Sequence, residues 1–242
     1  MNTEELAEKL VSWIRDRVLA ARCKGVVIGM SGGLDSSVLA VLCYRAFPRS
    51  MLGILMPCYS SQEGVEHAQA VANQFSIPTE KVALDNVFDA LLRVLPDNDV
   101  DSNISRVAKG NLKARLRMLT LYYFANRLNY MVVGSSNRSE LSVGYFTKYG
   151  DGGVDIMPLG NLVKGQVKEL AHFLGIPQLI IDKPPSAGLW EGQTDEGELG
   201  FSYDELDRYL VTGQANDELR RKIESMIATS NHKRQPPPVA RF

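Results

Sequence analysis

The sequence predicts an α/β fold, a doubly wound and mainly parallel sheet with helices on both faces in a Rossmann-like three-layer sandwich. Two observations support this prediction. Short apolar runs alternate with amphipathic stretches along the chain, and alternation of this kind builds parallel sheets. The first apolar run, residues 25–30, has no polar residue, as expected of a strand that helices cover on both faces.

The elements are expected in a regular order. Residues 3–22 have the apolar spacing of an amphipathic helix, and Asn2 with Glu5 can cap its start. Strands are expected at 25–30, 51–56, 81–84 and 130–133, and helices at 36–46, about 62–75, about 85–94, about 105–129, after Lys164, near 203–210 and near 216–229, before a Pro-rich basic tail.

The whole chain, 1–242, is expected to form a single domain. Its 242 residues are 45% hydrophobic and 23% charged, which is ordinary for a globular protein and excludes disordered and fibrous classes. The 27 Lys and Arg are offset by 28 Asp and Glu, for a formal net charge of -1. Composition therefore argues against a nucleic-acid or membrane-surface partner.

The sequence also restricts the cellular location of the protein and the redox state of its cysteines. No apolar stretch approaches the roughly 20 residues that cross a bilayer, and residues 1–5 are polar and acidic, unlike a signal peptide. A cytoplasmic protein is expected. The three cysteines, Cys23, Cys43 and Cys58, lack metal-type spacing and are expected to be free thiols.

The turn after the first strand predicts a phosphate-binding loop. It comprises Gly29, Met30, Ser31, Gly32, Gly33, Leu34, Asp35 and Ser36, and a helix follows. Paired glycines allow a tight turn close to a ligand, and hydroxyls with the free N–H groups of a helix start suit an anion. The loop has neither the Walker ending nor the dinucleotide glycine spacing. The alternative for Asp35 is a simple helix cap.

The S-G-G-x-D-S pattern resembles the pyrophosphate loop of the N-type ATP pyrophosphatases, which split ATP between the α and β phosphates to adenylate a substrate. Further segments are similar to those of NAD⁺ synthetases: GSSNRSE at 134–140, YFTKYGDGGVD at 145–155, PLGNLVK at 158–164, PSAGLW at 185–190 and NHKRQ at 231–235. The resemblance spans nearly the whole chain. It implies an adenine nucleotide alpha hydrolase-like fold and a ligase that amidates deamido-NAD⁺ to NAD⁺ with ammonia and ATP, releasing AMP and pyrophosphate, in the final step of NAD⁺ biosynthesis.

The resemblance assigns ATP and metal contacts. It implies Mg²⁺ on Asp35 and Glu140, because a carboxylate beside a phosphate needs a cation between them. From the residues alone, Glu140 is either a ligand at a strand end or an ordinary carboxylate at a helix start. A lysine at a helix start, such as Lys164, is unfavourable unless a phosphate is its partner. The implied ATP-binding residues are Gly29, Met30, Ser31, Gly32, Gly33, Leu34, Asp35, Ser36, Ser135, where many relatives carry Thr, Lys164 and Ser186.

The dinucleotide contacts follow in the same way, as Arg115, Lys148, Asp155, His232 and Lys233. Asn111 and Arg115 share a helix face, although a solvated basic face including Lys113 and Arg117 is the alternative. A flexible charged tail is the alternative for the segment around His232. Asp151 is the catalytic candidate that orients or deprotonates ammonia, although turn chemistry also explains an Asp-Gly-Gly sequence.

The sequence also leads to expectations about the oligomeric state, a lid and the source of nitrogen. The family implies a homodimer through its long helices, and the stripe of Leu112, Leu116 and Leu119 suits either that interface or an internal core. Residues 184–200 are expected to form a lid that keeps water from the adenylate. The loop begins after 28 residues, which leaves no room for a glutaminase domain, so free ammonia or a separate glutaminase is the expected nitrogen source.

Two other functions are the alternatives to this one. A tRNA-thiolating or tRNA-lysidine enzyme would carry a basic RNA-binding extension or a cysteine pair, which the neutral charge and scattered cysteines disfavour. A non-catalytic nucleotide-binding module would need only the loop. The presence of both Asp35 and Glu140 disfavours it.

Overall fold

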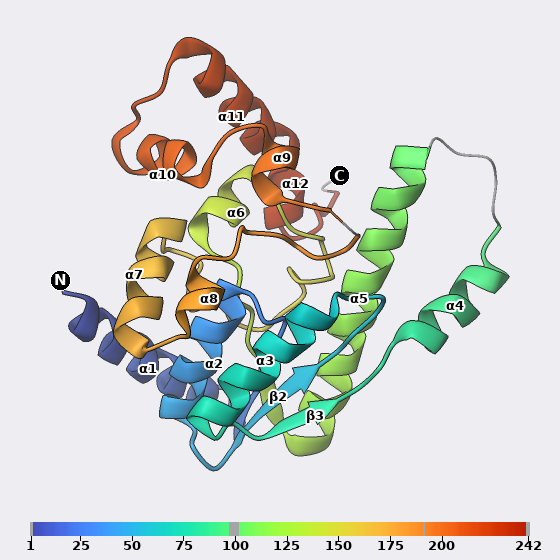
Figure 1. Cartoon of the computed structure of the whole chain (residues 1–242), viewed down its shortest axis with the longest axis vertical. Coiled ribbons are helices and arrows are strands. Elements are labelled where there is room, and N and C mark those ends of the chain that lie inside the picture. Colours follow the sequence, from blue (N-terminus) through green and yellow to red (C-terminus); the bar gives the residue numbers. More distant parts are fainter. Residues whose placement is uncertain (1, 97–101, 191, 241–242) are drawn as a thin grey trace.

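A parallel sheet lies at the centre of the computed structural model, which describes residues 2–96, 102–190 and 192–240 (Figure 1). The described strands run in the order β3-β2-β1-β4, and all pairs are parallel. The chain moves outward from β1 to β3 and then returns to place β4 on the other side of β1. The strand order thus reverses between β1 and β4, the point where such sheets open a ligand crevice. The strands are β1 (Gly25–Gly29), β2 (Met51–Leu55), β3 (Thr79–Lys81) and β4 (Tyr130–Val132).

Helices cover both faces of the sheet, which confirms the predicted fold class. Successive side chains of a strand point to opposite faces, so Val26 and Ile28 enter one core while Val27 enters the other. All three are fully buried. The first core is closed by α1 (Thr3–Ala20), α2 (Leu34–Ala46), α3 (Gln62–Phe75), α7 (Lys164–Leu174) and α8 (Gln178–Ile181), and the second by α4 (Asp85–Val94) and α5 (Ser102–Leu128).

A third apolar cluster lies apart from the sheet, where Leu199, Leu206 and Ile223 are almost fully buried together. In Figure 1 its helices stand above the sheet, next to the start of α7. They are α6 (Arg138–Val143), α9 (Asp195–Leu199), α10 (Tyr203–Thr212) and α11 (Asp217–Thr229), and the short helix α12 (Asn231–Arg234) follows α11.

The third strand lies earlier than expected. The apolar residues at 81–84 predicted a strand there, but β3 pairs Thr79 with Gly53 and Lys81 with Leu55. It is an edge strand, and polar, partly exposed side chains are typical of such a position. Pairing ends at Lys81 because β2 itself ends at Leu55, and α4 begins only four residues later.

The predicted helices form within a few residues of their expected bounds. The expected stripe on α5 divides, because Leu112 and Leu116 pack on the second core whereas Leu119 is 65% exposed. Residues 184–200 lack long secondary structure but contain α9, and the expected tail is helical over α12. Arg241 and Phe242 lie outside the described residues, as does Glu191. All three cysteines are free thiols, and no helix in the described ranges is long and apolar enough to cross a membrane.

Candidate active site

The glycine-rich loop joins β1 to α2 and wraps around its own hydroxyl groups. The Ser31 and Ser36 Oγ atoms lie 2.9 Å apart, and the Gly33 N–H donates to Ser31 Oγ at 3.3 Å. Gly33 is the N-cap of α2 and offers no side chain to the free N–H groups that follow. The helix start therefore keeps unpaired donors and a favourable dipole for an anion.

Within this loop, Gly32 occupies a position that only glycine fits. Its φ of +77° is a left-handed conformation that other residues rarely adopt. A Cβ there would also overlap the Gly64 carbonyl oxygen and lie 2.9 Å from the Ala68 nitrogen. The loop is thus pressed against α3, which holds it in place.

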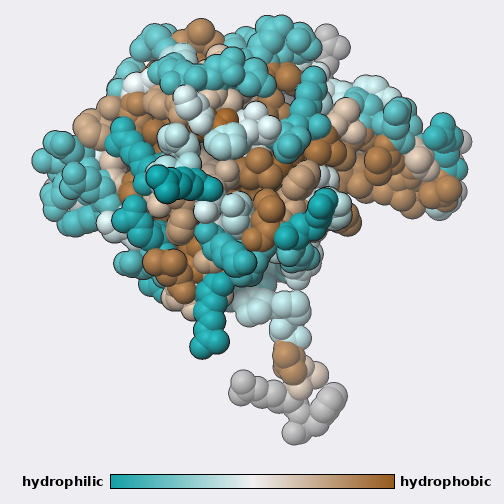
Figure 2. All heavy atoms as spheres, turned by 90° about the horizontal axis from the view of Figure 1, so that it is seen from below, coloured by the Kyte–Doolittle hydropathy of each residue, from teal (hydrophilic) through white to brown (hydrophobic). Residues whose placement is uncertain are grey.

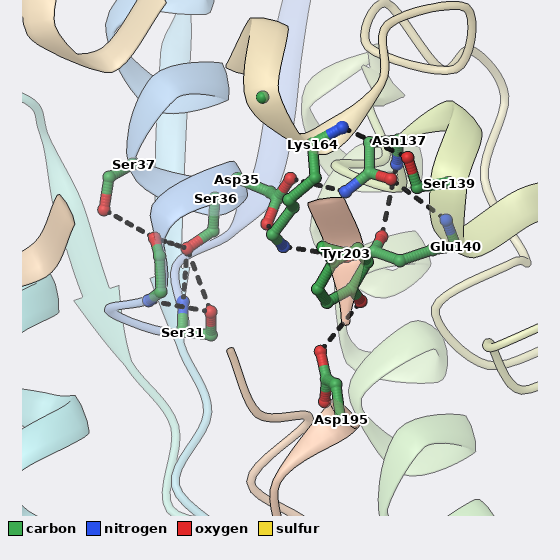
Figure 3. A network of polar contacts seen from close by, with 12 residues as sticks. Ser31, Asp35, Ser36, Ser37, Asn137, Ser139, Glu140, Lys164, Asp195 and Tyr203 are labelled. Atoms are coloured by element: carbon green, nitrogen blue, oxygen red, sulfur yellow. Dashed lines mark hydrogen bonds and ion pairs between the residues drawn. The ribbon is translucent and has the colours of Figure 1, made fainter. Parts of the chain in front are cut away.

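Asp35 lies in the first turn of α2 but does not cap it. Its Oδ1 accepts from Asn137 Nδ2 at 2.8 Å, and its Oδ2 accepts from Lys164 Nζ at 2.5 Å. The same Lys164 Nζ donates to Glu140 Oε1 at 3.1 Å. Figure 3 shows the four side chains converging from α2, α6 and α7. The structure therefore unites three predicted site residues that are far apart in the sequence.

Glu140 caps the start of its helix and also faces the charged cluster. Asn137 and Glu140 form a capping box at the start of α6: the Glu140 N–H donates to Asn137 Oδ1 and the Asn137 N–H donates to Glu140 Oε2. The other oxygen, Oε1, faces Lys164. Asn137 was missed as a site residue, although an Asn three positions before a Glu at a strand end could have indicated it.

The charges of this cluster are coupled. Lys164 Nζ lies between the two carboxylates, and the side chains of Lys164 and Asp35 are only 10% and 15% exposed. Burial raises the pKa of Glu140, and the neighbouring Asp35 adds to this while Lys164 opposes it. Burial by itself would lower the pKa of Lys164, but Asp35 and Glu140 together raise it. The lysine is therefore a charged ammonium held between two carboxylates.

The two carboxylates fit a magnesium ion that arrives with a nucleotide. The ammonium of Lys164 is itself a cation between Asp35 and Glu140, which shows that the pair can accommodate positive charge. Within the described ranges, no group of three or more His, Cys, Asp or Glu residues could hold a metal ion. A pair of carboxylates suits Mg²⁺, which usually takes one or two protein carboxylates together with substrate phosphates.

A second group brings together predicted dinucleotide contacts from three parts of the chain. Arg115 Nη2 donates to the Lys148 carbonyl at 3.2 Å, and Lys148 Nζ donates to the His232 carbonyl at 2.6 Å. Lys233 Nζ donates to the carbonyls of Gly144 and Phe146 at 2.8 and 2.9 Å. The segment around His232, for which a flexible tail was the alternative, is thus the helix α12, and these hydrogen bonds hold it against the body of the protein.

Asp151 lies near this second group. Its Oδ1 accepts from the Thr147 N–H at 2.9 Å. Its side chain is exposed, yet protein surrounds it densely enough that desolvation raises its pKa, while Lys233 and Arg117 oppose the rise. The Asp151 carboxyl therefore lies within electrostatic range of Lys233, a predicted dinucleotide contact.

Asp155, Ser135 and Ser186 are placed differently. Asp155 binds the edge of the sheet, because its Oδ2 accepts from the Val132 N–H at 2.8 Å and its Oδ1 from the Tyr122 hydroxyl at 2.9 Å. Ser135 is half-buried just beyond β4. Ser186 Oγ donates to the Gln193 carbonyl at 2.7 Å, and its hydrogen bonds to described residues stay inside its own segment.

The expected lid rests on α5. Lys113 Nζ donates to the Leu189 carbonyl at 2.9 Å, and a Cβ on Gly110 would lie 3.2 Å from both Leu189 and Trp190. The Arg106 guanidinium lies 5.1 Å from the centre of the Trp190 ring. Lys113 is 8% exposed, so part of the face considered as solvated basic surface is buried under this segment.

Fold and site together define a nucleotide-binding α/β protein. The phosphate loop follows β1, the two carboxylates follow β1 and β4, and the strand order reverses between these strands. Comparison with known proteins narrows the class. The family model described as NAD synthase matches residues 6–237, and the chain belongs to this family.

Individual relatives match over essentially their full length. The NH(3)-dependent NAD(+) synthetase of Carboxydothermus hydrogenoformans is 49% identical over 99% of this chain and 98% of that protein. NMN synthetase from Francisella tularensis superposes with a TM-score of 0.93 at 36% identity, covering 100% of both chains. NH3-dependent NAD synthetase from Campylobacter jejuni superposes with a TM-score of 0.83 at 26% identity, again covering 100% of both.

Proposed function

We propose that this chain is a ligase that amidates deamido-NAD⁺ to NAD⁺ with ammonia and ATP, releasing AMP and pyrophosphate. The observation that carries the proposal is the 49% identity, over almost all of both chains, to an NH(3)-dependent NAD(+) synthetase. The geometry supports it, because the phosphate loop, two carboxylates and a buried lysine meet beyond the ends of β1 and β4.

The reaction requires activation, because the two oxygens of a carboxylate share its negative charge and make it a poor electrophile. In the first step the nicotinate carboxylate attacks the α-phosphate of ATP, and pyrophosphate leaves. Ser31, Ser36 and the N–H groups at the start of α2 bind the phosphates. Lys164 lies close enough to this loop's helix to reach a phosphate oxygen, since its Nζ already contacts Asp35.

Asp35 and Glu140 are the residues that would hold Mg²⁺. The metal would supply positive charge to the phosphates and so stabilise pyrophosphate as it departs. Asn137 holds both of these carboxylates, since it hydrogen-bonds to Asp35 and caps the helix that carries Glu140. The ligands are therefore positioned before any nucleotide arrives.

In the second step ammonia displaces AMP from the adenylate. Only neutral ammonia has a lone pair for this attack, so a base must take a proton from ammonium. Asp151 fills that role in the proposal, because it is exposed and lies within electrostatic range of Lys233, a proposed dinucleotide contact. Its raised pKa brings it closer to the range in which a general base works.

The second group would bind the dinucleotide. Arg115, Lys148 and Lys233 donate to backbone carbonyls, so their positive charges remain available to the phosphates of deamido-NAD⁺. His232 and Asp155 complete the set that the family resemblance implies. Ser135 and Ser186 would complete the ATP site, the latter by movement of the segment at 184–200.

The proposed assembly is a homodimer through α4 and α5. Figure 2 shows hydrophobic side chains gathered on the projection at the right, where α4 lies in Figure 1. Val94, Ile104 and Leu119 are between 61% and 76% exposed. An apolar surface of this kind indicates a protein contact.

A second substrate has its own support. The TM-score of 0.93 to NMN synthetase favours nicotinate mononucleotide, whose carboxylate would undergo the same amidation. The two substrates differ only by the adenylyl half of the dinucleotide, so the chemistry of the site suits both.

One assay tests both substrates. Purified protein with ATP, Mg²⁺ and ammonium should convert deamido-NAD⁺ to NAD⁺ with a higher kcat/KM than it shows for nicotinate mononucleotide, and AMP and pyrophosphate should appear in equal amounts. A preference for the mononucleotide would favour the second candidate. ADP and phosphate as products would overturn the proposed cleavage. Replacing ammonium by glutamine shows whether a separate glutaminase is needed.

A further inference from the structure

Asp207 of α10 contacts the starts of two helices that carry site residues. Its Oδ1 accepts from the Ser139 hydroxyl at 2.5 Å, and its Oδ2 accepts from the Gly165 N–H at 2.8 Å. Ser139 precedes Glu140 on α6, and Gly165 follows Lys164 on α7. We propose that Asp207 is a positioning residue that sets the placement of Lys164 and Glu140 for binding of MgATP, an inference that rests on the proposed function.

The start of α7 depends on this carboxylate because its own N-cap cannot replace it. Val163 is the N-cap and has no side-chain oxygen, so the first N–H groups of the helix need acceptors from elsewhere. The Lys164 N–H donates to Ser139 Oγ at 3.1 Å, and the Gly165 N–H donates to Asp207. The missing cap is supplied by α6 and α10.

Ser139 connects the two helix starts. Its Oγ donates to Asp207 and accepts from the Lys164 N–H, and the residue is fully buried. Its hydroxyl hydrogen is used by this arrangement, and Asp207 is an acceptor of fixed position. A change at Asp207 is therefore transmitted to the backbone beside Glu140 and to that of Lys164.

The same helix also covers the lysine head group. Tyr203 lies four residues before Asp207 on α10, so the two share a helix face. The centre of its ring is 4.9 Å from Lys164 Nζ, as the position of Tyr203 in Figure 3 illustrates. Leu206, fully buried in the third apolar cluster, holds α10 in place. Helix α10 thus contacts the Lys164 ammonium through Tyr203 and the N–H of the neighbouring Gly165 through Asp207.

Asp207→Asn is the direct test, because it keeps the shape but turns one acceptor into a donor that opposes the Ser139 or Gly165 donor. Partners of this kind typically change metal affinity or activity by about 10- to 100-fold. We expect the Kd for Mg²⁺ with a non-cleavable ATP analogue, measured by calorimetry, to rise about tenfold or more. The KM for ammonium should stay within about twofold.

Three further variants make the result specific. Ser139→Ala should weaken analogue binding in the same direction, and the double variant should be no worse than Asp207→Asn by more than about twofold, because both changes break one connection. Asp204→Asn is the matched control: it removes an exposed carboxylate from the same helix and should leave the Kd unchanged.

Several outcomes would overturn the proposal. These are a wild-type Kd in Asp207→Asn, additive losses in the double variant, or a lowered Tm with unchanged analogue binding. If Asp207→Asn does not fold, a wild-type Kd in Ser139→Ala overturns it instead. Failure of the proposed function would be seen separately, as absence of amidation with either nicotinate substrate, while analogue binding would still decide the role of Asp207.

Discussion

The charged side chains in the two groups of the site have different kinds of partner. In the first, the ammonium of Lys164 is buried against the carboxylates of Asp35 and Glu140, so opposite charges neutralise one another inside the protein. In the second, Arg115 and Lys148 donate to backbone carbonyls. Among the residues that the structure describes, neither of these cations forms an ion pair with a carboxylate.

This difference indicates how each group meets its ligand. Under the proposed function, phosphates would join the second group directly, because Arg115 and Lys148 are held in place without a paired carboxylate. The first group must exchange partners, because Lys164 occupies the space between the carboxylates that are proposed to bind Mg²⁺. Under the proposed function, the first group would therefore exchange an internal partner on binding, whereas the second would only add its ligand.

Removing the lysine should have the largest effect. Lys164→Met leaves two buried carboxylates without a counter-charge, and breaking a buried pair in this way costs about 3–5 kcal/mol of unfolding free energy. We expect a loss of that size in the presence of a chelator, and partial recovery on adding Mg²⁺, by denaturant unfolding. Lys168→Met, an exposed lysine of the same helix, is the control. Recovery by Mg²⁺ that is equal in the wild type would contradict the exchange of partners.

Asp35→Asn should act on turnover more than on stability. The variant keeps the Lys164 and Glu140 contact, so the fold should persist, but it removes one proposed metal ligand. We expect ATP–pyrophosphate exchange with deamido-NAD⁺ to fall at least about a hundredfold, beyond what loss of a mere supporting contact costs. Near-normal exchange at ordinary Mg²⁺ would show that the metal binds elsewhere.

Arg115→Met tests the second group. A hydrogen bond to a charged group is worth about 1.5–3 kcal/mol, so the KM for the dinucleotide should rise about tenfold or more while the KM for ATP stays constant. Steady-state kinetics with each substrate varied in turn separates the two. An equal change in both values would argue that Arg115 acts through the structure and not through its charge.

Arg115→Lys should have the smallest effect and sharpens the comparison. Among the residues that the structure describes, Arg115 donates one hydrogen bond, to the Lys148 carbonyl, so this contact does not use the whole planar guanidinium fork. If uncompensated charge is what the dinucleotide recognises, its KM should change by no more than about threefold. A change as large as that of Arg115→Met would instead indicate recognition by a bidentate guanidinium.

The sequence predicted the fold class and the strand, turn and helix at residues 25–46 well, because both follow from local patterns. It placed the third strand at 81–84 because Val82 and Leu84 are apolar, whereas register with β2 sets β3 at Thr79–Lys81. It grouped Lys113 with a basic face, but contact with Leu189 buries it. Such errors arise where an element's environment depends on a distant segment.

The candidate site also divides into features that the local sequence indicates and features that depend on distant segments. Asp35, Glu140 and Lys164 were implied by family resemblance, but the contacts between them were not visible. Asn137 and Asp207 were missed, since their partners lie far along the chain: Asn137 is 102 residues from Asp35, and Asp207 is 68 from Ser139. Only the capping spacing of Asn137 and Glu140 was a local indication.

The sequence by itself determined the strand, the glycine turn and the helix at residues 25–46, because steric limits on the backbone and apolar alternation act within a few residues. Tertiary structure decided which charges meet. The chain places β4 beside β1 only after completing the outer strands, and this brings the starts of α2, α6 and α7 together. The pairing of Lys164 with two carboxylates is a consequence of that topology, because spacing along the chain contains no information about it.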